Sequence, residues 1–371
     1  MLVYISGFLI SCMIIGKTES WSHKSVGYAF WTCVALAIPC LIAGLRADTI
    51  GTDVLGYTKP LYQLAESNVS LFDYYDAHWW RDWRNAGPAD FEPGFSVLVW
   101  LATRVFGSFP AVLFVIQLFT VMPIFCALTR MRDKAPVWLG MLVYYFMYFN
   151  SSLNLMRQWI AMAILLYAYR FLVERRIRRY LAMVVVAMLF HKSALMGVAV
   201  LALQVFLVYT GKRKFWRVVA IAGVGVAALS FAGYAASFLY AHGFYQYAGY
   251  LGNVSFSLNQ LILRLPPLLV LLACWRRMGE RGECAAFFVA AAVLDIVAAQ
   301  LGTASEQATR IALYFGGYLV LSLPHALASV RSLSNRLALG MLTLGYLAAY
   351  WVVIYSMLGS SETVPYVSIL S

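Results

Sequence analysis

The chain has 371 residues, of which 62% are hydrophobic and only 12% are charged, and its formal net charge is +12. A soluble domain usually carries about 25% charged residues, so this composition excludes a water-soluble particle and predicts a surface that mostly faces lipid. The positive charges lie in short clusters between apolar runs, as in the cytoplasmic loops of membrane proteins. This pattern excludes nucleic acid as their partner.

The apolar runs predict a polytopic, all-α integral membrane protein. A helix needs about 20 apolar residues to cross the hydrocarbon, and Lys and Arg in short loops mark the cytoplasmic side. The first run lacks a basic segment before it and a cleavage signature after it, so we expect a retained helix. The path begins and ends outside, and about twelve spans are expected, at residues 2–16, 25–45, 110–129, 136–150, 153–173, 181–191, 194–211, 216–241, 259–275, 284–303, 309–330 and 337–358.

Residues 94–107 do not fit this path. They are apolar over about 14 residues, or about 21 Å as a helix, which is too short for a full crossing. Counting them as a span would also move the arginine-rich loop at 174–179 to the outside. We therefore expect a re-entrant or half-depth helix entered and left from the outer side. Since no internal repeat or linker is visible, residues 1–371 are expected to form a single transmembrane domain.

The long polar segment at 46–92 is expected to be an external loop. It holds 4 basic and 8 acidic residues, the opposite of the cytoplasmic loops. Its stretch at 71–85 is rich in aromatic residues, which predicts a helix lying in the headgroup layer. The alternative for this stretch is sugar stacking on Trp79, Trp80 or Trp83.

Arg46 sits where the second helix leaves the membrane, and a Gly-Thr-Asp turn follows at 51–53. Gly51 permits a backbone geometry that other residues resist, and this turn would place Asp53 near a fixed cation. As an alternative, Arg46 could simply extend its side chain to the membrane interface.

Arg157 and Gln158 lie about one turn inside the outer end of a helix that is otherwise apolar. An arginine within a span is costly and usually faces a protein interior or an aqueous cavity. Asn154 lies one turn earlier, on roughly the same face. The alternative is an arginine that reaches the headgroups, but Gln158 beside it gains nothing from lipid.

Further polar residues are predicted near the outer surface. His191 lies at the tip of a hairpin, where it serves the turn alone or acts as a general base, because imidazole titrates near neutral pH. Arg310 lies one turn into its span, and Arg264 lies at a similar depth. Asp295 lies near the middle of its span, where an acidic side chain needs a partner. Our hypothesis is that Asp295 pairs with one of these arginines.

Together, Arg46, Arg157 and Arg310, with Arg264 as a further candidate, describe an electropositive cavity that would repel itself when empty. The simplest guest that stabilises such a cavity is a polyanion. The planar fork of arginine suits phosphate oxygens, and the polyanion available in a membrane is a lipid phosphate or diphosphate.

At these residues the sequence resembles the EpsG family of exopolysaccharide and capsule polymerases, which are Wzy-like. The motifs follow the family order over about residues 40–320. Those that match are Arg46, Gly51-Thr52-Asp53, Tyr57, Glu92-Pro93-Gly94-Phe95, Asn150, Asn154, Arg157-Gln158, Ala161, Phe190-His191, Ser193-Ala194, Arg310 and Tyr314-Phe315. Lys192, directly after the histidine, is a departure from the pattern.

The resemblance implies a GT-C-like polymerase in the bacterial inner membrane, with its active site facing the periplasm. Such an enzyme is a glycosyltransferase that needs neither a metal nor a cofactor. It moves a glycan from a polyprenyl diphosphate carrier onto a sugar hydroxyl of the next lipid-linked repeat unit. The implied partners are the polyprenyl-diphosphate-linked oligosaccharide, membrane lipids, and chain-length regulator and flippase proteins, with no nucleic acid.

The implied roles place Arg46, Arg157 and Arg310 on the diphosphate, where cations stabilise the charge that develops on the leaving group. The candidates for the base that takes the proton of the acceptor hydroxyl are His191, Asp53 and Glu92. Other substrate-binding roles are expected for Arg264, Glu92, Asn154, Gln158 and Tyr57.

Other classes of membrane protein remain as alternatives. A flippase or transporter of the same lipid-linked glycans needs a basic cavity too, but alternating access favours inward-facing polar residues and repeat symmetry. A membrane acyltransferase with His191 as base would need an acyl donor that reaches it from the cytoplasm. A purely structural subunit is disfavoured by the arginines within the spans.

Overall fold

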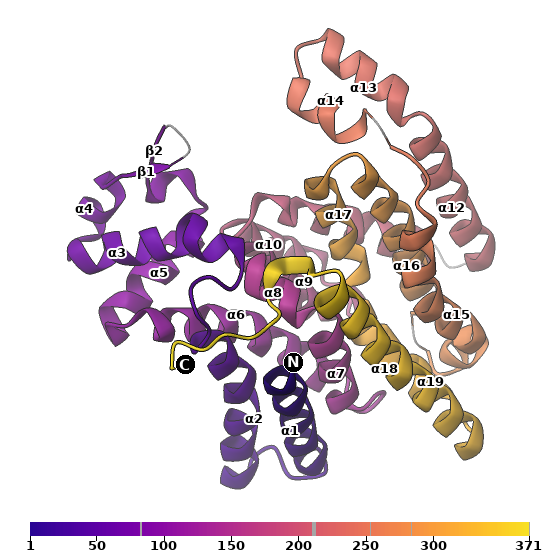
Figure 1. Ribbon diagram of the computed structural model, residues 1–371. Coiled ribbons are helices and arrows are strands. Elements are labelled where there is room, and N and C mark those ends of the chain that lie inside the picture. Colours follow the sequence, from indigo (N-terminus) through magenta and orange to yellow (C-terminus); the bar gives the residue numbers. More distant parts are fainter. Residues whose placement is uncertain (82–83, 210–212, 253, 283, 371) are drawn as a thin grey trace. The chain divides into compact units, whose positions relative to one another are not determined.

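The computed structural model describes residues 1–81, 84–209, 213–252, 254–282 and 284–370 (Figure 1). Over these residues the protein is mostly helical, and its one sheet has two short strands. The predicted all-α class is therefore confirmed. The chain divides into two compact units, residues 1–195 with 347–371, and residues 196–346.

Seven helices in the described part of the chain are long and apolar enough to cross a membrane. An eighth span results if α12 (Lys214–Ser230) and α13 (Ala232–Ala241), which are bent by 51°, count as one. Three shorter apolar helices are α1 (Leu2–Thr18), α5 (Pro93–Phe106) and α7 (Val137–Met147). The protein is thus a multi-pass membrane protein, whereas the twelve spans, the half-depth position of α5, the GT-C-like arrangement and the single domain stay predictions.

In the first unit, α2 (Val26–Gly44) packs against α1 and against α6 (Phe109–Thr129) (Figure 1). α6 packs in turn against α9 (Met156–Val173), most of whose residues are buried. α10 (Ile177–Met188) packs on α9 and leads into the short helix η3 (Lys192–Leu195). The helix that carries Arg157 is therefore enclosed by its neighbours along most of its length.

A break in the chain separates α8 (Phe149–Asn154) from α9. Leu155 has a ψ of 52°, outside the helical range, so the predicted span at 153–173 begins only at Met156. Arg157 consequently lies in the first turn of α9, and the expectation that it lies a full turn inside a helix is wrong.

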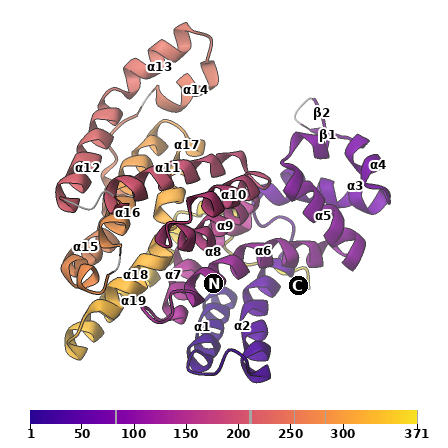
Figure 2. The ribbon, with the colours of Figure 1, turned by 180° about the vertical axis from the view of Figure 1, so that it is seen from behind.

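The segment at 46–92 forms a series of short elements, which leads into α5. One of them, α3, packs on α5 (Figure 2). These elements are η1 (Val54–Thr58), α3 (Lys59–Ser67), α4 (Leu71–Asp76), β1 (Trp79–Arg81), β2 (Arg84–Ala86) and η2 (Pro88–Asp90).

The prediction of an interfacial helix over 71–85 is wrong for the residues after α4, which ends at Asp76. The backbone becomes extended at Ala77, and β1 then pairs with β2 in an antiparallel hairpin. Trp79 stacks on Phe91, with ring centroids 5.9 Å apart and 9° between the planes. This packing and the hairpin pairing replace the helix. Trp80 is 67% exposed, and Trp83 lies outside the described residues.

The second unit is built around α16 (Ala285–Ala299), which packs against α12, α15 and α17. Its other elements are α11 (Met196–Gln204), η4 (Val205–Tyr209), α12, α13, α14 (Tyr245–Leu251), α15 (Leu258–Glu280), η5 (Gln300–Thr303), α17 (Glu306–Gly316), α18 (Leu319–Ser329) and most of α19 (Leu333–Trp351). After α19 the chain returns to the first unit through η6 (Val352–Met357) and η7 (Ser360–Glu362).

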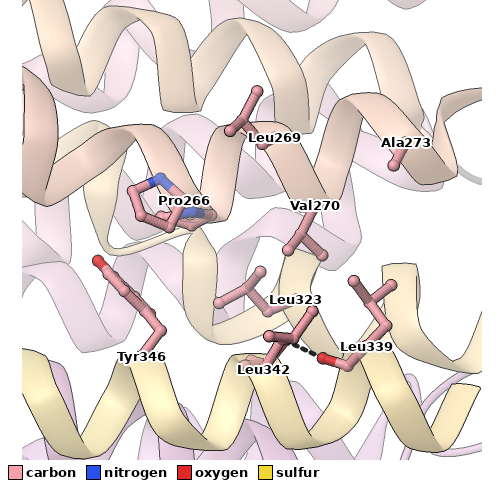
Figure 3. Close-up of a pocket in the computed structure, with 10 residues that line it drawn as sticks. Pro266, Leu269, Val270, Ala273, Leu323, Leu339, Leu342 and Tyr346 are labelled. Carbon is pink, nitrogen blue, oxygen red and sulfur yellow. Dashed lines mark hydrogen bonds between the residues drawn. The ribbon is translucent and has the colours of Figure 1, made fainter.

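A pair of prolines shapes the second unit. Pro266 and Pro267 lie inside α15 and have no backbone N–H, so two carbonyl groups one turn earlier lose their helical donors. The carbonyl oxygen of Leu263, four residues before Pro267, accepts a hydrogen bond from the Tyr346 hydroxyl of α19 at 2.7 Å. In a membrane, where water does not reach the carbonyl, this hydrogen bond satisfies an acceptor that the prolines leave open. The prolines and Tyr346 also line an apolar groove of about 410 Å³ between α15, α18 and α19 (Figure 3).

We expect Tyr346→Phe to lower the free energy of unfolding by about 0.5–1.5 kcal/mol, because the carbonyl of Leu263 loses its donor while the apolar contacts of the ring stay. Thermal unfolding of the purified protein in detergent measures this change. Tyr234→Phe is the matched control, because Tyr234 is 76% exposed on α13. Equal unfolding midpoints for the two variants would show that the hydrogen bond contributes nothing.

Candidate functional site

Arg46 follows α2 and lies inside the first unit. Only 2% of the residue is exposed, so the alternative in which it extends to the membrane interface is wrong. Its Nη2 donates to the carbonyl oxygen of Leu153 at 3.0 Å and lies 3.4 Å from the Sδ of Met156. Burial lowers the pKa of the guanidinium to about 10, so the group stays charged at neutral pH.

The backbone on both sides of Arg46 pairs with the C-terminal segment. The N–H of Ala47 donates to the carbonyl of Val367 at 2.8 Å, and the N–H of Ile369 donates to the carbonyl of Leu45 at 3.0 Å. Two distant parts of the chain therefore fix the position from which Arg46 reaches the break between α8 and α9.

The Gly-Thr-Asp turn is docked on the same break. Gly51 has a φ of +86°, and a Cβ at this position would lie 3.1 Å from the carbonyl oxygen of Leu153, so glycine is required here. The amide oxygen of Asn154 accepts hydrogen bonds from the Thr52 hydroxyl at 3.0 Å and from the Asp53 N–H at 3.1 Å. Asn154 thus holds Asp53 beside the start of α9.

Tyr57 links this turn to Arg157. Its hydroxyl donates to Oδ2 of Asp53 at 2.6 Å. Burial and the charge of Asp53 raise the pKa of Tyr57 well above its ordinary value, so the hydroxyl remains a donor. The guanidinium of Arg157 lies 4.6 Å from the ring centroid of Tyr57 and 5.0 Å from that of Phe91. Both distances are typical of cation–π contacts.

Glu92 is the counterion of Arg157. Its Oε2 lies 2.5 Å from Nη1 of Arg157, and its Oε1 accepts a hydrogen bond from the Lys192 N–H at 3.0 Å. Close by, the N–H of Gly94 donates to the carbonyl of Leu189 at 2.8 Å. A Cβ at position 94 would lie 2.7 Å from that oxygen, so only glycine allows α5 to begin so close to the end of α10.

The charge state of Glu92 follows from its neighbours. Burial by itself would raise the pKa of the carboxyl, and only 7% of the residue is exposed. Arg157, the N–H of Lys192 and the nearby His191 act in the opposite direction, and the pKa of Glu92 is lowered overall. The carboxylate is therefore ionised at neutral pH.

His191 lies in the turn between α10 and η3. The backbone N–H of Ser193 donates to Nδ1 of His191 at 3.2 Å, and the Ser193 Oγ lies 2.5 Å from the same nitrogen. The turn thus holds the imidazole next to the residue whose N–H binds Glu92.

Six of the ten predicted site residues form one network in the first unit. They are Asp53, Tyr57, Glu92, Asn154, Arg157 and His191. Arg46 lies next to this network, through its bond to Leu153, whereas Gln158 is buried with its Nε2 3.9 Å from the Sδ of Met162.

The other two predicted residues, Arg264 and Arg310, lie in the second unit. Arg264 pairs with Asp295, with Nε 3.2 Å from Oδ1, and its Nη1 contacts Gln260. The hypothesis that Asp295 is paired with an arginine is confirmed. Arg310 lies in α17, and the binding of a phosphate by either arginine stays a prediction.

Phe91, Thr52 and Ser193 belong to this network but were not predicted as site residues. Phe91 directly precedes Glu92, and Thr52 and Ser193 lie inside the motifs that match the EpsG pattern. Their contacts connect distant segments and cannot be read from a local pattern. The sequence indicates these residues only by their positions in or next to the motifs. Across the residues that the structure describes, no group of three or more His, Cys, Asp or Glu side chains is placed to hold a metal ion.

The network combines a cation that can bind an anionic group with a carboxylate and an imidazole that can accept a proton. The side chain of Arg157 is 21% exposed and lies in the first turn of α9, where the N–H groups and the helix dipole also favour an anion. Asp53 supplies a half-buried carboxylate, and His191 supplies a half-buried imidazole.

Comparison with known proteins identifies a family. The model of the EpsG family matches residues 28–368, so the chain belongs to this family. The resemblance seen in the motifs is thereby confirmed over nearly the whole chain. No curated protein and no solved structure matches the sequence.

We expect Glu92→Gln to lower stability by about 3 kcal/mol at neutral pH, because Arg157 keeps its charge and loses its counterion. The folded pKa of Glu92 is depressed, so its contribution is present above the ordinary value of 4.5 and is lost as the pH falls through the folded pKa. Thermal unfolding at about pH 7 and about pH 3 should show a gap between wild type and variant that narrows on acidification.

The exposed Glu66 provides the control, and Glu66→Gln should unfold like the wild type at both pH values. A gap for Glu92→Gln that stays constant with pH would mean that the carboxylate is not ionised in the folded protein.

Proposed function

Because the chain belongs to the EpsG family, we propose that it is a polysaccharide polymerase. In this proposal it transfers a glycan from a polyprenyl diphosphate carrier onto a sugar hydroxyl of another lipid-linked repeat unit. The reaction takes place at the outer face of the bacterial inner membrane. Chain-length regulator and flippase proteins are the expected protein partners.

The contact that carries this proposal is the pair of Arg157 and Glu92 beside Asp53. It places a partly exposed arginine side chain at the start of α9 and a carboxylate within the same hydrogen-bonded network. A diphosphate needs cations and N–H donors, and a sugar hydroxyl needs an acceptor for its proton. The network offers both kinds of group.

The transfer requires one bond to form and one to break. The hydroxyl oxygen of the acceptor attacks C1 of the donor sugar, and the C1–O bond to the diphosphate breaks. The lipid diphosphate leaves with the bonding electrons, and Arg157 stabilises the negative charge that develops on it. The hydroxyl proton passes to a base, for which His191, Asp53 and Glu92 are the candidates.

Arg46 has a different role in this proposal. Its guanidinium is enclosed by protein and bonded to the carbonyl of Leu153, so we assign it as a positioning residue for the turn that carries Asp53. Arg310 and Arg264 remain candidates for contacts to the phosphates, and Asn154 and Gln158 remain candidates for contacts to sugar hydroxyls.

We expect Arg157→Ala to reduce chain lengthening by about 10²–10³-fold, because the leaving group loses its main cation. Arg157→Lys should fall between this variant and the wild type, since lysine keeps the charge but loses the planar fork. The assay supplies purified protein with lipid-linked repeat units and no nucleotide sugar, and it measures glycan length.

Arg178→Ala is the matched control, because Arg178 is exposed at the start of α10, and it should retain full activity. Normal polymer from Arg157→Ala would remove Arg157 from the site. If the wild type moves glycans across liposomes without lengthening them, the protein is a transporter and the polymerase proposal is wrong.

A further inference from the structure

The apolar groove of the second unit belongs to none of the segments that form the Arg157 network. It has a volume of about 410 Å³, and α15, α18 and α19 each contribute apolar side chains to it, such as Val270, Leu323 and Leu342 (Figure 3). The hydroxyl of Thr343, which also lines it, donates to the carbonyl of Leu339 at 2.8 Å and is thus satisfied within α19. The groove therefore presents mainly hydrocarbon to its occupant.

The two long helices beside the groove, α15 and α19, face lipid along much of their length. Both belong to candidate membrane spans, and only 17% of the residues in the most apolar part of each span are buried in the protein. An unfilled hollow forfeits dispersion contacts along its walls, and lipid tails are as apolar as leucine. A hydrocarbon chain is therefore the occupant that the surroundings of this groove supply.

Two exposed arginines continue the lining of the groove. On α15, Arg277 lies four residues after Ala273, and residues at this spacing share one face of a helix. On α19, Arg336 lies three residues before Leu339 and seven before Thr343, so it shares their face. Each line of apolar side chains thus leads to a guanidinium that solvent can reach.

The contacts between α15 and α19 place both arginines at the same end of the groove. Near the start of α15, the carbonyl of Leu263 accepts the hydrogen bond from Tyr346 at 2.7 Å. At the end of α15, Glu280 pairs with Arg331, which lies just before α19, and Oε2 is 3.2 Å from Nη2. The two exposed arginines lie three and five residues from this ion pair along the chain, so the helices run antiparallel and share one basic end.

We propose that this groove binds one anionic phospholipid. An acyl chain lies against the apolar walls and fills the hollow between the three helices, while the phosphate group lies at Arg277 and Arg336. Basic pockets between membrane helices suit anionic head groups, and the guanidinium fork suits phosphate oxygens. The basic end faces the side that the positive clusters predict to be cytoplasmic, so the lipid comes from that leaflet. This site goes beyond the proposed polymerase function and does not depend on it.

The charge of the head group provides the first test. Native mass spectrometry of the protein in a neutral detergent measures the binding of phosphatidylglycerol and of phosphatidylcholine with the same acyl chains. We expect phosphatidylglycerol to bind about 25-fold more tightly, because each arginine near an anionic head group contributes about fivefold. Arg277→Gln and Arg336→Gln should each lose about fivefold of this preference, and the double variant should bind both lipids equally. Arg178→Gln, at an exposed arginine of the first unit, is the control that keeps the preference.

The groove itself is tested by filling it. Leu342 lines the groove and is 70% exposed, whereas its neighbour Met341 is 67% exposed and points about 100° away around α19. We expect Leu342→Trp to weaken the binding of both lipids by about tenfold or more, since each CH₂ group kept out of the groove costs about fourfold. Met341→Trp, the matched control, should bind both lipids like the wild type.

Four results would each overturn the proposal. They are equal affinity of the wild type for the two lipids, equal loss of binding in Leu342→Trp and Met341→Trp, tighter binding of polyprenyl phosphate than of phosphatidylglycerol, and a wild-type dimer that Leu342→Trp converts to a monomer. The third would make the groove a site for the carrier lipid, and the fourth would make it an interface between copies. A wild-type protein that lengthens no glycan would refute the polymerase function and leave the phospholipid site standing.

Discussion

The candidate site depends on the ion pair between Arg157 and Glu92. A guanidinium in the first turn of α9 meets the positive end of the helix dipole, and it needs a carboxylate close by. Glu92 comes from the start of α5, and its second oxygen binds the N–H of Lys192 in the turn after α10. One carboxylate therefore joins three segments, and the aromatic rings of Tyr57 and Phe91 pack against the cation.

The ion pair between Arg157 and Glu92 argues against a cavity of unpaired arginines, which the sequence predicts. Four arginines in one cavity would repel each other, but Arg157 is paired with Glu92 and Arg264 with Asp295, while Arg46 is bonded to a backbone carbonyl. In the proposed function, an incoming diphosphate would meet a cation that already has a counterion. Under that proposal, the diphosphate would share Arg157 with Glu92 or replace Glu92 as its partner, so N–H groups and neutral donors around Arg157 would contribute to binding together with the positive charge.

Much of the fold was predictable because long apolar runs specify helices, and each predicted span overlaps a helix of the structure, with different bounds. The family motifs also named most members of the network. Local patterns could not predict the hairpin after α4, because the stacking of Trp79 on Phe91 depends on tertiary packing. The break at Leu155 and the burial of Arg46 were missed for the same reason, since each depends on contacts between distant segments.

The pairing of Leu45 and Ala47 with Ile369 and Val367 bears on how the protein is made. During synthesis, the segment that holds Arg46 leaves the ribosome long before the strand-like partner that fixes it. The helices around it can already be inserted in the membrane, but the backbone on both sides of Arg46 gains these hydrogen bonds only after residues 367–369 have been synthesised. The position of Arg46 is therefore fixed only after the helices that lie between these two segments in the sequence have been synthesised.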